Sequence, residues 1–355
     1  MATTMNPSGG SRRNHAVPGR PVLDPAQWLG SDLADRSDWI HLLSDAETSG
    51  LTEMASRLRP SIGDDPTRLL SIRKDAFELG TFRATLTKIQ SELRDGLGLA
   101  LIRGLPIADL DPIDTATIYW GIGCHLGRAI SNNPEGDMIG HVIDAGKDIE
   151  DPRHRGYQTN VTMEFHCDQS DIVGLLCVRT AKSGGLSKVA STIAVYNELI
   201  RRRPDLIAVL TQPFCWSKHG ETKHGERSYY ESPVFNFLDG KLSGAVAPKH
   251  IEKGHALADA PDITPLQYEA IMVTEEICKE LHYAMDFHPG DMQFLNNSVV
   301  VHTRTGFEDW PEPERKRTLW RLWLAAPDMR PPTPYIKQWR GGIHVEGTHE
   351  RIVLI

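Results

Sequence analysis

The sequence predicts a mainly β fold, either a barrel or a double-sheet jelly roll, with helices inserted between its strands. Three observations lead to this prediction. Many short apolar runs are separated by Gly, Pro and Asp, helical patterns interrupt these runs, and the chain has no internal repeat. Short strands bounded by turn residues are typical of sandwiches and barrels rather than of α/β folds built from regular βαβ units.

The N-terminal quarter predicts a tail and a helical extension. Residues 1–24 are rich in Gly, Ser, Pro and Arg, and we expect them to be poorly ordered because they offer little apolar surface to bury. Residues 25–95 mix polar and apolar residues at helical spacing, which predicts two or three helices. The apolar run at 98–104 begins and ends with glycine and predicts a buried strand.

The middle of the chain predicts a helix, a loop and then short strands. The helix spans 114–126 and should end at Gly127. Residues 131–160 show no periodicity, and because long loops inside compact domains are usually functional, we expect a lid there. Residues 161–191 predict strands separated by glycines, and a helix over 193–203 should stop before the proline that follows.

The C-terminal part predicts hairpins, one long helix and two further strands. A turn at Asp239–Gly240 marks a hairpin within 212–262. Thr264 and Pro265 suit the N-cap and first turn of a helix that runs to about residue 285. The runs at 292–302 and 318–325 predict strands, and a proline-rich tail follows them.

Composition excludes several classes of function. The 355-residue chain is 40% hydrophobic and 24% charged, with a formal charge of −8, which argues against a nucleic-acid or anionic-membrane partner. Its five scattered cysteines contain no CxxC pair, so we expect free thiols in a reducing compartment. With no apolar run long enough for a membrane span or a secretory signal, we expect a cytoplasmic protein. The sequence leaves the oligomeric state open, a homo-oligomer included.

One pair of residues suggests a metal site. His166 and Asp168 stand two positions apart, and alternate side chains of a strand point to the same face. An imidazole with a carboxylate suits ferrous iron, which often takes two histidines and one carboxylate. His302, at the end of a β-branched run, is the candidate for the third ligand. Taken singly, each histidine is more simply read as structural, since the chain contains 15 of them.

Two arginines suggest an anion near this site. Arg317 and Arg321 share one face of the strand predicted after residue 317. Buried arginines are costly unless they meet anions, and a guanidinium can hold both oxygens of a carboxylate. A dicarboxylate cosubstrate would supply that anion, and structural ion pairs with Asp or Glu are the alternative.

The order of these residues resembles the taurine dioxygenase (TauD/TfdA-like) family of Fe(II)/2-oxoglutarate-dependent dioxygenases. His-x-Asp is followed by a distant His and then by an Arg 15 residues later. The resemblance covers about residues 96–330. It includes the segments GLALIRGLP, SGGLSKVAS, PGDMQFLNNSVVVH and RTLWRLWL. One departure is Ser298, which stands where the family often has an arginine.

The resemblance implies a fold and a set of roles. It implies a double-stranded β-helix (jelly roll) core over 96–330 within a single oxygenase domain, 25–355, whose tail, 331–355, lies near the active site. The implied Fe(II) ligands are His166, Asp168 and His302. Arg317 and Ser187 would hold the far carboxylate of 2-oxoglutarate. Arg321 would meet the substrate or the near carboxylate of 2-oxoglutarate.

The implied reaction uses Fe(II), 2-oxoglutarate and O2 to oxidise a C–H bond and releases succinate and CO2. Glu164 stands two residues before His166, so on a strand it would face the metal, where it could hold a substrate ammonium. With Arg321 this favours a small amino or carboxylic acid as substrate. The outcome stays open between hydroxylation, desaturation, fragmentation and ring formation, such as an aziridine from a branched-chain amino acid. The alternatives are a zinc-dependent hydrolase and a non-catalytic small-molecule binder on the same barrel.

Overall fold

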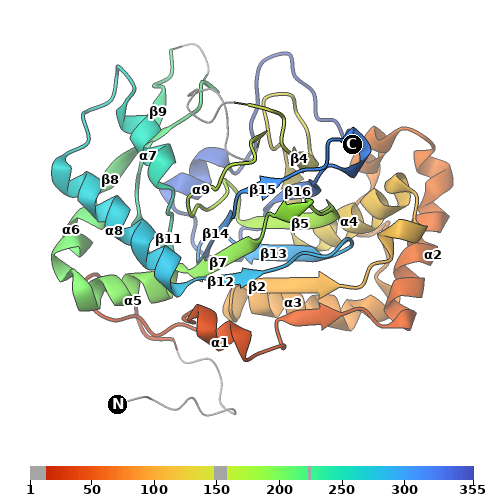
Figure 1. The fold of residues 1–355 in the computed structure, drawn as a ribbon, viewed down its shortest axis with the longest axis horizontal. Coiled ribbons are helices and arrows are strands. Elements are labelled where there is room, and N and C mark those ends of the chain that lie inside the picture. The colour runs from red at the N-terminus through yellow and green to blue at the C-terminus, as the bar shows by residue number, and fades with distance from the viewer. Residues whose placement is uncertain (1–12, 148–157, 223–224) are drawn as a thin grey trace.

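Two central sheets form the core of the protein (Figure 1), whose computed structural model describes residues 13–147, 158–222 and 225–355. The larger sheet has the order β1-β2-β13-β5-β16-β3, and β4 also pairs with β16. Its strands are β1 (Ile40–Leu42), β2 (Leu99–Arg103), β3 (Arg128–Ile130), β4 (Gly140–Val142), β5 (Ile172–Arg179), β13 (Met292–Asn296) and β16 (Thr318–Ala325). Since β16 has β5 along one side and β3 and β4 along the other, its register is set from both sides.

The smaller sheet has the order β12-β7-β14. Its strands are β12 (Tyr283–Met285), β7 (Ser187–Ser191) and β14 (Val300–Arg304). Beyond β14 an isolated antiparallel bridge joins His302 to His166. The remaining strands form pairs: β6 (Ser183–Gly184) with β15 (Phe307–Glu308), β8 (Pro213–Ser217) with β9 (Tyr229–Pro233), and β10 (Phe235–Leu238) with β11 (Lys241–Gly244).

The alternation of side chains along the strands divides the apolar core into two layers. On one face of the larger sheet, Leu175 and Leu319 pack in the same cluster as Val189 of the smaller sheet. On the other face, Leu176 and Trp320 pack against the N-terminal helices. Because successive residues of a strand point to opposite faces, a continuous apolar run can serve both layers. The core is therefore the predicted jelly roll.

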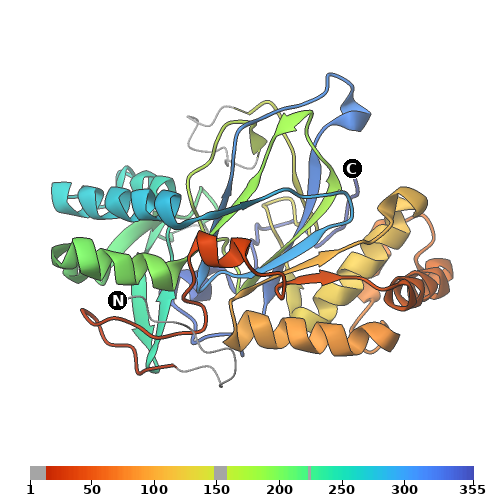
Figure 2. The same cartoon turned by 60° about the horizontal axis from the view of Figure 1, so that its bottom comes forward.

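Helices cover the outer sides of this core. On one side lie α2 (Asp45–Ile62), α3 (Arg83–Asp95) and α4 (Pro112–Leu126), and α1 (Gly30–Ala34) lies beside β12. The others are α5 (Thr192–Arg202), α6 (Ile207–Leu210), α7 (Pro248–His255), α8 (Pro265–Leu281) and α9 (Pro334–Trp339). Short 3-10 helices span Pro66–Ser71, Gly80–Phe82, Ile107–Asp109, Pro204–Leu206 and Pro313–Arg315. Figure 2 shows α5 and α8 side by side at the opposite end from α2 and α3. None of the described helices is long and apolar enough to cross a bilayer.

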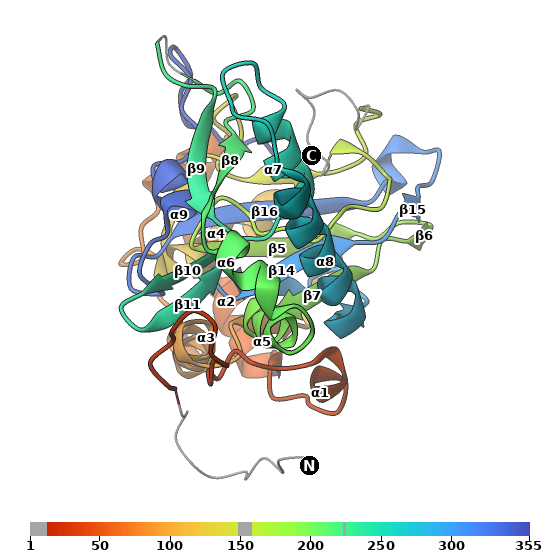
Figure 3. The ribbon, with the colours of Figure 1, turned by 90° about the vertical axis from the view of Figure 1, so that its left-hand side faces the viewer.

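Helix α8 follows from its sequence and positions part of the site. Thr264 accepts a hydrogen bond from the Gln267 N–H while Gln267 reaches back to Thr264, and Pro265 opens the first turn. The helix ends four residues earlier than predicted because residues 283–285 pair with β7 as strand β12. Figure 3 shows α7 beside the β8–β9 hairpin.

The structure corrects two predicted strands. The run at 161–168 is not a strand, since only His166 forms a β-bridge there. The run at 292–302 is two strands, β13 and β14, which belong to different sheets. The chain turns between them because Asn296 accepts a hydrogen bond from the Ser298 N–H and donates to Leu93 O, and such local side-chain bonds favour a turn over a strand.

Residues 13–24 are packed, although the sequence predicted disorder for the whole of 1–24; residues 1–12 lie outside the described part. The Ala16 N–H donates to Gly240 O, and the Val22 N–H donates to Asn197 Oδ1. Both of these apolar side chains are buried. The segment lacks any periodicity, so its order comes from docking onto α5 and the β10–β11 hairpin, which the local sequence does not reveal. Of the predicted lid, residues 148–157 also lie outside the described part, and 140–142 form β4.

Candidate active site

One pocket collects six of the residues singled out from the sequence. They come from four places: the segment before β5, strand β7, strand β14, and β16 with the residue before it. The pocket is lined by Val142, Met163, His166, Asp168, Leu175, Ser187, Phe287, His302, Thr303, Arg304, Arg317, Leu319 and Arg321. The structure thus brings together His166, Asp168, Ser187, His302, Arg317 and Arg321.

The two histidines face each other across a pair of backbone hydrogen bonds. The N–H of His166 donates to His302 O (2.9 Å), and the N–H of His302 donates to His166 O (2.8 Å). Their ring centroids are 4.5 Å apart. Nδ1 of His166 lies 2.9 Å from Glu164 O, so in the tautomer protonated at Nδ1 the ring donates there. The lone pair of Nε2 then remains available for a metal.

Asp168 lies between the histidines and an arginine. Its Oδ1 accepts a hydrogen bond from Nη1 of Arg321 (3.2 Å). Its Oδ2 is buried, has no hydrogen-bond partner among the described residues, and lies 3.6 Å from Nε2 of His302. Burial acts to raise the pKa of Asp168, but Arg321 and the two histidines outweigh it, so the pKa lies below its usual value. Asp168 is therefore an anion with one oxygen free to bind a cation.

Both imidazoles are neutral at physiological pH. Burial lowers the pKa of His302 to about 3, with a further contribution from His166. Burial also lowers the pKa of His166. Two neutral imidazoles and one carboxylate form the donor set that suits ferrous iron. Within the described ranges no group of three or more His, Cys, Asp and Glu residues forms a preformed metal centre, so the fit rests on this chemistry and on the unpartnered Oδ2.

Arg317 fits the carboxylate of a diacid. Its side chain is only 4% exposed, and burial lowers its pKa. Its Nη1 has no hydrogen-bond partner in the described part of the chain. A buried donor without a partner is costly unless a ligand satisfies it. Ser187, a buried residue of β7, lines the same pocket and offers a hydroxyl.

The sequence analysis missed two polar residues of this region. Nε of Arg321 donates to Oδ1 of Asn132 (3.0 Å), so this buried asparagine orients the guanidinium. Arg304 lines the pocket, and burial lowers its pKa to about 10. Its position two residues after His302 on one strand was a usable signal. No local pattern marks Asn132, which reaches the site only through the fold.

The structure does not bring Glu164 into the pocket. Its carboxylate instead accepts a hydrogen bond from the Lys249 N–H (2.9 Å) at the start of α7. The expectation that it faces the metal relied on strand alternation. Only His166 forms a β-bridge in this segment, and the next backbone bond to β14 comes from the Met163 N–H to Arg304 O, so regular alternation does not extend back to residue 164.

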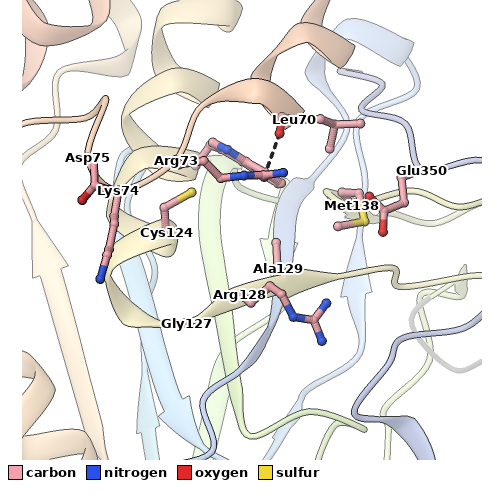
Figure 4. Close-up of a pocket in the computed structure, with 11 residues that line it drawn as sticks. Leu70, Arg73, Lys74, Asp75, Cys124, Gly127, Arg128, Ala129, Met138 and Glu350 are labelled. Carbon is pink, nitrogen blue, oxygen red and sulfur yellow. Dashed lines mark hydrogen bonds between the residues drawn. The ribbon is translucent and has the colours of Figure 1, made fainter.

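A second hollow, of about 530 Å³, lies near α4 and β3 and contains none of the predicted site residues. Figure 4 shows Arg73 and Arg128 within it and the carboxylates of Asp75 and Glu350 also lining it. Its charges are mixed and exposed, and the guanidinium of Arg73 donates to Leu70 O. The side chains that a metal-dependent enzyme would need therefore lie in the first pocket and not in this one.

A jelly roll whose pocket joins two neutral imidazoles, a carboxylate and buried arginines defines a class of protein, the non-haem iron oxygenases. The family model "Taurine catabolism dioxygenase TauD, TfdA family" matches residues 64–323. The chain belongs to this family. It is accordingly a non-haem iron(II), 2-oxoglutarate-dependent dioxygenase.

Individual relatives agree with this assignment. The chain is 30% identical over 319 residues to FR-33289 synthase of Streptomyces rubellomurinus (strain ATCC 31215), an alignment that covers 88% of this chain and 92% of that protein. A solved structure of asparagine oxygenase with Fe(II), 2S,3S-3-hydroxyasparagine and succinate is similar in fold, with a TM-score of 0.63, 18% identity, and coverage of 86% of this chain and 99% of that one. The oxygenase OrfP with Fe and alpha-ketoglutaric acid has a TM-score of 0.58 at 15% identity, over 81% of this chain and 94% of that one.

Proposed function

We propose that this dioxygenase oxidises a C–H bond of a small amino acid or a related carboxylic acid. In this proposal His166, Asp168 and His302 bind Fe(II), and Arg317 with Ser187 binds the far carboxylate of 2-oxoglutarate. The observation that carries it is the convergence of these residues, from separate parts of the chain, on one pocket. We also propose that residues 25–355 act as one oxygenase domain, since α9 of the tail contacts the segment that holds His166.

The substrate class follows from the rest of the pocket. Arg321 offers a cation beside Asp168 and can hold an acid group. The pocket is also lined by apolar side chains, which suit an aliphatic carbon chain; this apolar wall consists of Val142, Leu175, Phe287 and Leu319. One structural neighbour described above, the asparagine oxygenase, was solved with a hydroxylated asparagine, which supports an amino acid over a polymer or lipid.

The chain's own groups perform four tasks in this mechanism. Bound iron, 2-oxoglutarate and O2 supply the oxidising power that removes hydrogen from the substrate. The two histidines stay neutral and hold the metal with Asp168. Arg317 fixes one end of 2-oxoglutarate, and Arg321, oriented by Asn132, fixes the substrate acid so that one C–H bond lies beside the metal. The apolar wall limits the access of water before the substrate arrives.

The proposal is tested by a screen for succinate release. Purified enzyme with Fe(II), 2-oxoglutarate and O2 is offered the proteinogenic amino acids and short organic acids one at a time. We expect at least one of them to raise succinate release above the substrate-free rate, with a product heavier by one oxygen or lighter by two hydrogens. Failure of every acid to do so, in enzyme that binds iron and 2-oxoglutarate, would contradict the substrate class. Hydrolytic turnover with zinc would favour the rival hydrolase, although Asp168 is the only carboxylate among the described residues that line the pocket.

A further inference from the structure

The segment that carries His166 and Asp168 pairs with a neighbouring strand on one side only, through the bridge of His166 to His302. On that side, His166 exchanges both of its backbone hydrogen bonds with His302 of β14. In an extended chain the backbone groups of residues 165 and 167 point the opposite way. No described strand pairs with residues 165 and 167 there, since the only β-bridge of this segment is that of His166 with His302. Buried backbone N–H and C=O groups need hydrogen-bond partners, so groups other than a strand must bond those of residues 165 and 167.

Glu275 of α8 satisfies the first of these groups. Its two carboxylate oxygens lie 3.2 and 3.1 Å from the backbone N of Phe165, whose N–H donates to them. The side chain of Glu275 is buried, and the ammonium of the half-exposed Lys279 lies 3.8 Å away. A buried carboxylate costs free energy that an amide or hydroxyl in its place would not. Glu275 nevertheless accepts a hydrogen bond from the N–H of Phe165, one residue before His166. This indicates that Glu275 helps to hold His166 in place.

Tyr335 of α9 satisfies a second group on the same side. Its hydroxyl donates to the backbone O of Cys167 (2.9 Å), between His166 and Asp168. The Cys167 N–H donates to Val246 O (3.1 Å). The Tyr335 ring is buried and packs edge-on against Trp216, so the hydroxyl has little freedom to move.

We propose that Glu275 and Tyr335 are positioning residues that take the place of the missing strand and set the spacing of the two iron ligands. Residues 165 and 167 flank His166, so holding their backbone groups fixes the direction of its ring and of the Asp168 carboxylate. Both residues come from helices outside the two core sheets, and both lie more than 100 residues after the segment in the sequence. The inference rests on the proposed iron site but concerns residues that contact neither metal nor substrate.

Three substitutions test it. E275L removes the acceptor for the Phe165 N–H, whereas E275Q keeps an acceptor oxygen and removes only the charge. Y335F removes the hydroxyl and keeps the ring. The matched control is Y119F, since Tyr119 is equally buried and donates to a backbone oxygen, that of Trp320 (3.2 Å), on the other face of the larger sheet. Anaerobic titration with Fe(II) gives the affinity, and the visible band formed with 2-oxoglutarate reports the ligand geometry.

We expect E275L and Y335F each to weaken Fe(II) binding about tenfold, the effect typical of groups that orient metal ligands, and to shift or weaken the visible band. E275Q and Y119F should stay within about twofold of the parent enzyme and keep its band. Affinities and bands of E275L and Y335F that match those of Y119F would overturn the proposal, and so would E275Q behaving like E275L. Y335F keeps the test decisive if E275L does not fold. Failure of the parent enzyme itself to bind iron would instead contradict the proposed function.

Discussion

The pocket has two halves that are built in opposite ways. Arg321 lies within β16, which has partner strands along both sides, and its neighbours repeat the alternation of a regular strand. His166 and Asp168 lie on a segment with a single β-bridge, and side chains from α8, α9 and residue 297 hold further backbone groups of that segment. The half proposed to bind anions therefore depends on strand register, and the half proposed to bind metal depends largely on separate side chains.

This difference explains which sequence arguments succeed. Along β16, and in the residue just before it, alternation holds from Arg317 through Leu319 to Arg321, and all three line the pocket. Along the metal-binding segment it holds for His166 and Asp168 but not for Glu164. Residues 319–321 of β16 are paired on both sides and keep the pleat of a strand, whereas one bridge constrains only the residues beside it.

The largest expected effect is that of removing a proposed metal ligand. H302A should abolish measurable iron binding and lower turnover by more than about 10²-fold, because even groups that only orient metal ligands are worth up to about that much. Anaerobic Fe(II) titration and succinate release measure it. The control is H125A. His125 lies on α4, away from the pocket, and its ring bonds Phe77 O. Iron binding retained in H302A would show that His302 is not a metal ligand, and the contrast between a metal-binding and an anion-binding half would no longer hold.

The next effect tests the anion-binding half. R317A should raise the KM for 2-oxoglutarate about 10²-fold, since breaking a buried charged pair is costly, and R317K should do so less because lysine cannot bond both oxygens. Iron affinity should stay near that of the parent enzyme. The exposed neighbour Arg315 supplies the control variant, R315A. A fall in iron affinity equal to the rise in KM would show that the two halves are not separate.

The free energy of unfolding should depend on the protonation of Glu275, the buried carboxylate that bonds the Phe165 N–H. Burial raises the pKa of Glu275 to about 7, and the nearby Glu164 adds to this, whereas the Phe165 N–H and Lys279 oppose it. The folded protein thus binds this proton more tightly than the unfolded chain, whose carboxyl has an ordinary pKa. Stability from this group is present at low pH and is lost as pH rises toward 7.

E275Q cannot titrate, so it should lose less stability than the parent enzyme between pH 5 and pH 8. The difference should be about 2 kcal/mol, from the pKa shift and its linkage to folding. Chemical denaturation of the apoprotein at the two pH values measures it. Parallel pH profiles for the two proteins would mean that Glu275 titrates normally and that its burial costs little.

The smallest expected effect concerns the orientation of Arg321. N132L removes the acceptor of its Nε hydrogen bond without adding charge, and we expect the KM for the acid substrate to rise about tenfold, close to the value of one hydrogen bond to a charged group. The KM for 2-oxoglutarate should hardly change. N132D, which keeps the acceptor but adds a negative charge beside Arg321, should raise the substrate KM as well, because it competes with the substrate acid. Equal effects on both KM values would show that Asn132 supports the whole pocket rather than Arg321.

Much of the fold and the proposed site was predictable from residues near one another in sequence. The capping residues of α8, the Asp239–Gly240 turn of the β10–β11 hairpin, and the apolar runs of β5 and β16 all act locally. The spacing of His166 and Asp168 and that of Arg317 and Arg321 are also local. The family resemblance then joined these pieces to His302.

The sequence by itself determined the types of donor group and the short spacings that put pairs of them on one face. Only the tertiary structure decided the rest: that 292–302 divides between two sheets, that residues 13–24 are packed, that Glu164 turns toward α7, and that Asn132, Glu275 and Tyr335 reach the site. The physical reason is that buried polar groups take whichever partners the packed elements bring within hydrogen-bond distance. Those partners lie 85 or more residues away in sequence, as with Glu164 and Lys249, beyond the range of any local pattern.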